Sequence, residues 1–175
     1  VEWDRNAFKK IKNLKTLIIK SGIFSKGPKH LPNTLRVLEW WRYPSQDFPY
    51  SFLPEKLFIC KLFNGCFSSL GLAALLSKKA SVSFSFFFML LMLVNLKSLN
   101  FSLCQYLTHI PDVSCVLHLE KLSFRCRENL FTIHYSVGLL EKPIVLNAFG
   151  CLKLKSFPPI KLSNSYFHTF ELCPS

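Results

Sequence analysis

The sequence predicts an α/β solenoid: a curved stack of about seven irregular coils, with short parallel strands on the concave side and loops or short helical turns on the convex side. Leucines recur at intervals of 21–24 residues along most of the 175-residue chain. Within each interval they alternate with other residues, as inward and outward side chains do along a strand. Half of the residues are apolar and the mean hydropathy is +0.25, which favours a folded domain over a disordered tail.

The repeat is clearest in the second half of the chain, where apolar positions superpose at an offset of 23 residues. The pairs at this offset are Leu96 and Leu119, Leu99 and Leu122, Phe101 and Phe124, Leu107 and Leu130, and Ile110 and Ile133. Steps of 24 lead from Leu122 to Leu146 and Phe170, and steps of 21 and 22 join Leu17, Leu38 and Cys60. The recurring L-x-x-L-x-L is the signature of leucine-rich repeats, in which each coil buries its apolar side against the next.

One segment, residues 80–93, interrupts this repeat. Leu57 and its next equivalent, Leu96, are separated by much more than one ordinary step, and removing 80–93 brings the separation close to the usual step. The segment reads ASVSFSFFFMLLML and, extended to residue 96, just reaches the lower limit of length for a membrane helix. A membrane span would separate coils that must stack, so we favour a foreign segment, such as a retained intron, over a membrane span or a buried helix. The expected division is N-terminal repeats in 1–79, the apolar insertion in 80–93 and truncated C-terminal repeats in 94–175.

The seven cysteines are odd in number and include no C-x-x-C pair, which favours a reducing compartment and buried thiols over disulfides or a metal site. Cys104 and Cys151 each come shortly after an inward strand position, where the repeat predicts a side chain buried at the turn out of the strand. Cys126 and Cys173 come early relative to this position, so we expect the coil around Cys126 to be slightly shifted in register. The chain starts with Val1, without a secretory signal, and we expect it to be a piece of a larger protein.

The formal net charge of +12 comes with only 18% charged residues, so a dense nucleic-acid-binding arm is not indicated. A basic run near the N-terminus lacks the interleaved aromatic residues of a stacking surface, which favours a solvated face or one that docks an acidic partner domain. The run comprises Lys9, Lys10, Lys12, Lys15, Lys20, Lys26 and Lys29. No H-E-x-x-H, G-x-S-x-G or G-x-x-x-x-G-K-[ST] motif occurs, so we expect no catalysis, no metal and no cofactor.

Four stretches resemble consecutive coils of one protein family. Residues 35–44 (LRVLEWWRYP) are similar to its L-R-x-L-x-W-x-x-Y-P stretch, and residues 110–114 (IPDVS) with 118–122 (HLEKL) to its I-P-D-x-S…N-L-E-x-L coil. Residues 129–138 (NLFTIHYSVG) resemble N-L-x-x-I-H-x-S-V-G, and residues 150–159 (GCLKLKSFPP) resemble G-C-x-K-L-x-x-F-P. The family is the leucine-rich-repeat region of plant Toll/interleukin-1-receptor-type nucleotide-binding (TIR-NBS-LRR) disease resistance proteins.

This resemblance implies a protein-recognition and autoregulatory segment of an intracellular plant immune receptor, acting in the defence response and in signal transduction. The implied partners are a pathogen effector or a guarded host protein, and the nucleotide-binding domain of the full-length receptor. The implied location is cytoplasmic or nuclear. The alternative is a non-functional truncated resistance-gene product, associated with a membrane if residues 80–96 insert into one.

Recognition in such a solenoid would use the outward side chains of the concave strands, where aromatic and arginine residues are the usual anchors. The alternative for each residue alone is a solvated or locally packed strand position. The predicted protein-binding residues are Lys20, Glu39, Trp41, Lys61, Phe63, Asn100, Arg125, Asn147 and Phe149. Ile18, Ser102, Lys121 and Ser123 are further outward positions on the same strands.

Overall fold

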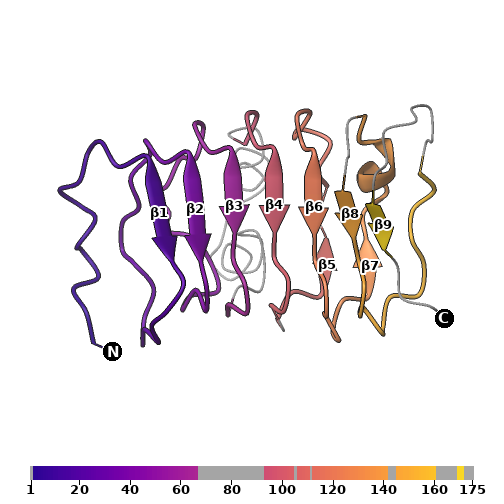
Figure 1. Cartoon of the computed structure of the whole chain (residues 1–175), viewed down its shortest axis with the longest axis horizontal. Helices are drawn as coiled ribbons and strands as arrows, with labels where there is room; N and C mark the ends of the chain where they lie inside the picture. Colours follow the sequence, from indigo (N-terminus) through magenta and orange to yellow (C-terminus); the bar gives the residue numbers. More distant parts are fainter. Residues whose placement is uncertain are drawn as a thin grey trace, which may run out of the picture.

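The computed structural model describes residues 2–66, 93–104, 106–110, 112–141 and 145–160, and the backbone of 169–171. Seven short strands form one parallel sheet in the order β1-β2-β3-β4-β6-β8-β9, side by side along the long axis of the molecule (Figure 1). They are β1 (Thr16–Ile19), β2 (Val37–Trp40), β3 (Ile59–Lys61), β4 (Ser98–Asn100), β6 (Lys121–Ser123), β8 (Val145–Asn147) and β9 (Thr169–Glu171). The predicted leucine-rich-repeat solenoid is therefore confirmed.

The opposite side of the coils is built mainly of turns and extended chain. It carries a two-stranded parallel sheet of β5 (His109–Ile110) and β7 (Thr132–Ile133), in which Ile110 pairs with Ile133 as the repeat spacing predicts. Across the described ranges the only helix is one 3-10 turn, η1 (Tyr135–Leu139). The helical turns expected on this side are thus limited there to η1, and none of the described helices is long and apolar enough to cross a membrane.

The strand register is the one that the leucine spacing predicts. Leu17 pairs with Leu38, Leu38 with Cys60, Leu99 with Leu122, and Leu122 with Leu146. The side chains in this row are all buried and form the spine of the core. A one-residue slip would turn an entire strand's apolar side chains toward solvent, so burial of this row fixes the register.

β3 and β4 are direct neighbours although the longest step of the repeat separates them. Cys60 pairs with Leu99, and Lys61 with Asn100. Residues 67–92 lie outside the described residues, and with them all of the predicted insertion except Leu93, which is buried. The coils on the two sides of this segment therefore stack as consecutive coils of the solenoid. Cys173 also lies outside the described residues.

Among the described residues, five coils leave their strands through the same left-handed turn. Arg42, Asn64, Leu103, Cys126 and Gly150 occupy equivalent positions and have φ values between 50° and 77°. Their backbone N–H groups form a ladder: each of the first four donates to a carbonyl of the next coil at 2.7–3.0 Å. Positive φ is unfavourable for side chains with a Cβ, so repetition of this turn in five coils shows how strongly the stacking imposes it.

A second set of hydrogen bonds between neighbouring coils, from buried side chains to backbone carbonyls, explains the cysteine positions. The Cys104 thiol donates to the carbonyl of Leu62 at 2.9 Å, and the Cys151 thiol donates to that of Phe124 at 3.2 Å. Both cysteines are buried, as predicted, and burial raises the pKa of the Cys104 thiol. Each thiol therefore satisfies a strand-end carbonyl of the preceding coil, which would otherwise be buried without a donor.

In the β6 coil this position belongs to Arg127. Its guanidinium Nε donates to the carbonyl of Phe101 at 2.9 Å, and one Nη donates to the same oxygen. The expected shift around Cys126 is thus wrong: Arg127 replaces a cysteine without a slip in register, and Cys126 occupies the exposed turn position. The expectation of buried thiols therefore holds for Cys60, Cys104 and Cys151, whereas Cys66 and Cys126 are exposed.

Candidate protein-binding face

The outward side chains of the seven-stranded sheet form three rows, which we call the strand face. The first row is Thr16, Val37, Ile59, Ser98, Lys121 and Val145, and the middle row is Ile18, Glu39, Lys61, Asn100, Ser123 and Asn147. The third row follows the strand ends and contains Lys20, Trp41, Phe63, Ser102, Arg125 and Phe149. All nine predicted binding residues lie in these rows, because inward leucines leave every second position facing outward.

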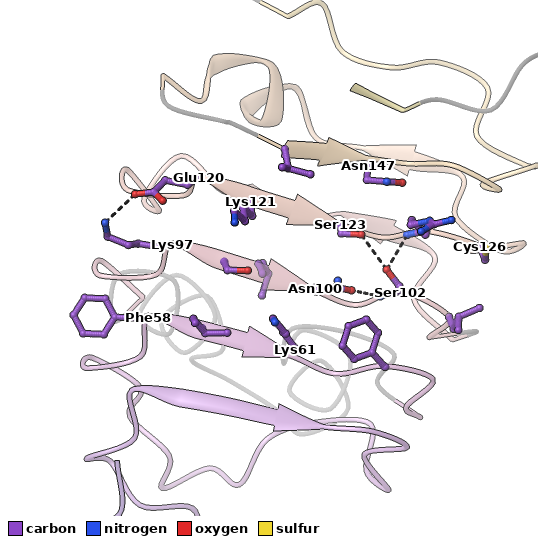
Figure 2. Close-up of a pocket in the computed structure, with 17 residues that line it drawn as sticks. Phe58, Lys61, Lys97, Asn100, Ser102, Glu120, Lys121, Ser123, Cys126 and Asn147 are labelled. Atoms are coloured by element: carbon purple, nitrogen blue, oxygen red, sulfur yellow. Dashed lines mark hydrogen bonds and ion pairs between the residues drawn. The ribbon is translucent and has the colours of Figure 1, made fainter. Parts of the chain in front are cut away.

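A groove of about 790 Å³ lies on this face over β3, β4, β6 and β8 (Figure 2). Its floor is made of small polar side chains, Asn100, Ser102 and Ser123. Phe63 and Arg125 line it from the two flanking coils. The strand face is therefore hollowed where the outward residues of β4 are small.

Hydrogen bonds fix the floor of the groove. The hydroxyl oxygens of Ser102 and Ser123 lie 3.0 Å apart, and the backbone N–H of Arg125 donates to the Ser102 hydroxyl at 3.2 Å. The Asn100 side-chain oxygen accepts from the Ser102 N–H at 2.9 Å. This network joins β4 to β6, so the floor is rigid before any partner binds.

Basic side chains outnumber acidic ones around the groove. Four cations line it, Lys61, Lys97, Lys121 and Arg125, with Glu120 as the one acidic lining residue among those described. Glu120 pairs with Lys97 at 2.9 Å (Figure 2). Within the described part of the chain, no carboxylate lies within 4.0 Å of the charged groups of Lys121 or Arg125.

Aromatic side chains lie on both sides of Ser102 and Arg125 in the third row. The rings of Trp41 and Phe63 are 5.3 Å apart, and the Trp41 indole N–H donates to Glu39 at 3.1 Å. On the other side, the Arg125 guanidinium lies 5.6 Å from the ring centre of Phe149. Trp41 and Phe149 remain 43% and 44% exposed, so both keep surface for a partner.

The structure refines the predicted set in two ways. Asn147 is only 7% exposed, and its side-chain oxygen accepts from the Phe149 N–H at 3.1 Å, so its main contact supports the turn. Sequence reasoning missed Phe58 and Lys97, which also line the groove. Each comes directly after the first leucine of an L-x-x-L-x-L motif. The sequence would have identified both if the position after that leucine had been counted among the outward positions.

Away from the strand face, Asp112, His134 and Ser136 meet between two coils. The Ser136 hydroxyl lies 2.9 Å from His134 Nδ1 and accepts from the Val113 N–H at 2.9 Å, while the Asp112 carboxylate is 3.7 Å from the same Nδ1. A catalytic triad requires serine and aspartate on opposite ring nitrogens of histidine, with an accessible hydroxyl. Here both approach one nitrogen and Ser136 is buried, so the cluster joins coils and has no triad geometry.

The pKa of the Asp112 carboxyl group is displaced from its ordinary value. Burial acts to raise that pKa, but hydrogen bonds from Ser114 and Ser136 and the nearby His134 imidazole outweigh it. The pKa of Asp112 therefore lies below its ordinary value, which means that the folded chain favours the carboxylate.

The parallel strands, the buried leucine spine and the three outward rows together define a leucine-rich-repeat solenoid. In comparison with known proteins, several plant TIR-NBS-LRR disease resistance proteins match at 24–33% identity over most of the chain, which is consistent with the leucine-rich-repeat region of such a protein.

Three relatives illustrate the match. Protein SUPPRESSOR OF npr1-1, CONSTITUTIVE 1 of Arabidopsis thaliana is 29% identical over 89% of this chain and 10% of its own length. TMV resistance protein N of Nicotiana glutinosa is 24% identical over 100% of this chain and 14% of its own. Disease resistance protein RPS6 of Arabidopsis thaliana is 33% identical over 78% of this chain and 13% of its own.

The chain thus spans between 10% and 14% of the length of the curated relatives that it matches. No protein-family model matches the chain. No solved structure matches it either.

Proposed function

We propose that this chain is a protein-recognition and autoregulatory segment of an intracellular plant immune receptor, with no catalysis of its own. The observation that carries the proposal is the strand face, where exposed aromatic and basic side chains stand on a rigid parallel sheet. A pathogen effector or a guarded host protein would bind there. The resistance proteins that match the chain support a role in immunity.

The chemistry of the strand face supports recognition of a protein. Binding energy at protein interfaces concentrates in a few tryptophan, tyrosine and arginine residues. Trp41 and Arg125 are such residues, and each is held by a neighbouring ring, Phe63 or Phe149. Side chains held in this way lose less conformational entropy when a partner binds.

Site-specific crosslinking tests this function. A photoreactive phenylalanine analogue replaces Trp41 or Phe149 on the strand face, and Leu152, which is 75% exposed outside the three rows, serves as the matched control. After irradiation in leaf extract, we expect the two strand-face positions to crosslink to a common protein and position 152 to leave it uncaptured. Equal capture from all three positions would contradict recognition by the strand face.

The basic N-terminal run supports the autoregulatory part of the proposal. Lys9, Lys10, Lys12 and Lys15 are all exposed, and their charge suits docking against an acidic surface of the receptor's nucleotide-binding domain. We expect Lys9→Glu with Lys12→Glu to weaken co-precipitation of this chain with that domain. The exposed pair Lys56→Glu with Lys155→Glu changes the charge equally elsewhere, and equal losses in both variants would refute docking through the run.

We also propose that residues 80–93 are foreign to the repeat and lie between two sets of repeats, in 1–79 and 94–175. The direct pairing of Cys60 with Leu99 supports this, because the flanking coils stack without a further strand between them. A spliced transcript that lacks codons 80–93 is expected in RNA from the source tissue. Its absence from deep sequencing would contradict the proposal.

A further inference from the structure

The cations of the groove differ in how they are neutralised. Lys97 has its own carboxylate, since Glu120 lies 2.9 Å away. Lys61 is 3.9 Å from Glu39, which also lies 3.8 Å from Lys20, so one carboxylate serves two lysines. Lys121 and Arg125 have no carboxylate within 4.0 Å among the described residues. The excess positive charge of the groove therefore concentrates on β6 and on the residues that follow it.

The arrangement of these two cations suits an extended chain. Lys121 and Arg125 are four positions apart along one strand and its extension, a separation of about 13 Å at the usual rise of an extended chain. Between them lie the small side chains of Ser123 and Ser102, which keep the groove open. A second extended segment running along β6 would bring carboxylates at the same spacing to both cations.

An apolar wall lies across the groove from the two cations, on the other side of β4. Phe58, Ile59 and Phe63 of the β3 coil line the same groove. Apolar side chains of a partner would be removed from water against this wall, while its carboxylates meet β6. The groove thus combines charge complementarity for an anion with an apolar surface on one side.

We propose that this groove binds an acidic, extended segment of a protein partner, with carboxylates on Lys121 and Arg125 and an apolar side chain on Phe63. This inference rests on the proposed function, recognition by the strand face, and adds the chemistry of what is recognised. A single-stranded nucleic acid fits less well, because the aromatic side chains that line the groove, Phe58 and Phe63, both belong to the β3 coil, and the outward residue between Lys121 and Arg125 is Ser123, which offers no ring for base stacking.

Peptide binding to the full chain tests the inference. The probe is a fluorescein-labelled peptide of about 12 residues that alternates glutamate and leucine, and the comparison peptide carries glutamine in place of every glutamate. Fluorescence anisotropy is recorded at about 50 and about 300 mM NaCl. We expect the glutamate peptide to bind about tenfold or more tightly than the glutamine peptide, and its affinity to fall at the higher salt concentration.

Variants locate the binding. Lys121→Gln with Arg125→Gln is expected to weaken binding of the glutamate peptide by about tenfold or more. The exposed pair Lys56→Gln with Lys155→Gln removes the same charge away from the groove and is expected to change it by less than about twofold. Thermal unfolding of each variant, followed by circular dichroism, verifies that the fold is unchanged, as expected for exposed side chains.

Three results would overturn the inference: equal binding of the two peptides, equal losses in the two double variants, or tighter binding of a single-stranded oligonucleotide than of the glutamate peptide. Each leaves the proposed function separately testable. Crosslinks from positions 41 and 149 to a common protein would preserve recognition by the strand face while the acidic segment is rejected. Loss of those crosslinks together with peptide binding would reject both.

Discussion

The N-terminal coils and the central coils of the solenoid have the same backbone geometry but are held together by different side chains. Around β1 and β2, four aromatic rings surround Trp40: Trp3, Phe8, Phe24 and Tyr43 lie edge-on at centroid distances of 5.3–6.2 Å. Around β4, β6 and β8, buried donors on Cys104, Arg127 and Cys151 reach back to carbonyls of the preceding coil. Packing of aromatic rings thus characterises the N-terminal coils, and hydrogen bonds from side chains to the backbone characterise the central coils.

The difference shows what the stacking of coils requires. Every coil must fill the space inside its strand and must also satisfy the carbonyl groups that its turn leaves unpaired. In the N-terminal coils large rings fill the space. In the β3 coil, Gly65 stands at the position that Cys104 occupies in the β4 coil. It leaves room for Tyr43, whose backbone and Cβ would lie 3.3 Å from an added Cβ. In the central coils hydrogen-bond donors occupy this position.

Replacing the central ring of the aromatic cluster should have the largest effect. Trp40 is fully buried, so Trp40→Ala removes its ring contacts and leaves a cavity. We expect the free energy of unfolding, measured by denaturant titration, to fall by about 4 kcal/mol. Trp41→Ala changes the adjacent, exposed tryptophan and should cost less than about 1 kcal/mol. Similar losses in both variants would mean that the aromatic cluster does not hold the N-terminal coils.

Arg127 offers a sharper test of the central coils. Burial lowers the pKa of its guanidinium to about 10, and its Nη1 is buried without a hydrogen-bond partner in the described part of the chain. Arg127→Ala removes both donors to the Phe101 carbonyl and should lower the free energy of unfolding by about 3 kcal/mol.

Arg127→Cys is the matched control, since cysteine fills this position in the β4 and β8 coils. It keeps one donor and avoids a buried charge, so it should be more stable than Arg127→Ala by about 1 kcal/mol. If alanine and cysteine gave equal stability, the side-chain donor would contribute nothing at this coil.

The left-handed turn found in five coils should give a smaller effect. Gly150 has φ of 77°, and a Cβ added to it would lie 3.1 Å from the Sγ and Cα of Cys126. Gly150→Ala is therefore expected to lower the free energy of unfolding by about 1–2 kcal/mol, measured by denaturant titration. Cys126→Gly, the reverse change at the equivalent turn, relieves positive φ and should be close to neutral. A neutral Gly150→Ala would show that the turn adapts.

The sequence was sufficient to predict the strand register but not the side chains that hold the coils together. Register follows from period alone, because a buried position recurs in each coil and only one alignment keeps Leu99, Leu122 and Leu146 inward. The role of Arg127 is not visible in this way. An arginine next to Cys126 looks like a displaced motif, and only the stacked coils show that a long side chain reaches the Phe101 carbonyl.

The strand face shows the same division. Its outward positions, Trp41 and Arg125 among them, follow from alternation along the strands. The shape of the groove depends on the sizes of side chains in neighbouring coils, which are one full repeat or more away in the sequence. These sizes determine that Ser102 is recessed and that Lys97 lines the groove. The sequence alone therefore predicts which residues face outward but not which of them form one groove.

The smallest effect is expected between the central coils on the side away from the sheet, where the contact is ionic and half-exposed. Asp112 has a pKa below its ordinary value of 3.8, so its carboxylate stabilises the fold above that pH. This contribution is lost as the pH falls through the lower pKa of the folded state. We expect Asp112→Asn to lower the free energy of unfolding at pH 7 by less than about 1 kcal/mol, since the side chain is 47% exposed.

Denaturant titrations from pH 7 to about 3 provide the measurement. The variant should lose less stability than the parent chain below about pH 4, because it has no carboxylate to protonate there. Glu55→Gln, at an exposed site without this cluster, is the control and should follow the parent. If Asp112→Asn also followed the parent, the two central coils would be joined at this point by the Ser136 hydroxyl and the Val113 N–H alone, as a neutral contact. The central coils would then gain no stability from the charge of Asp112.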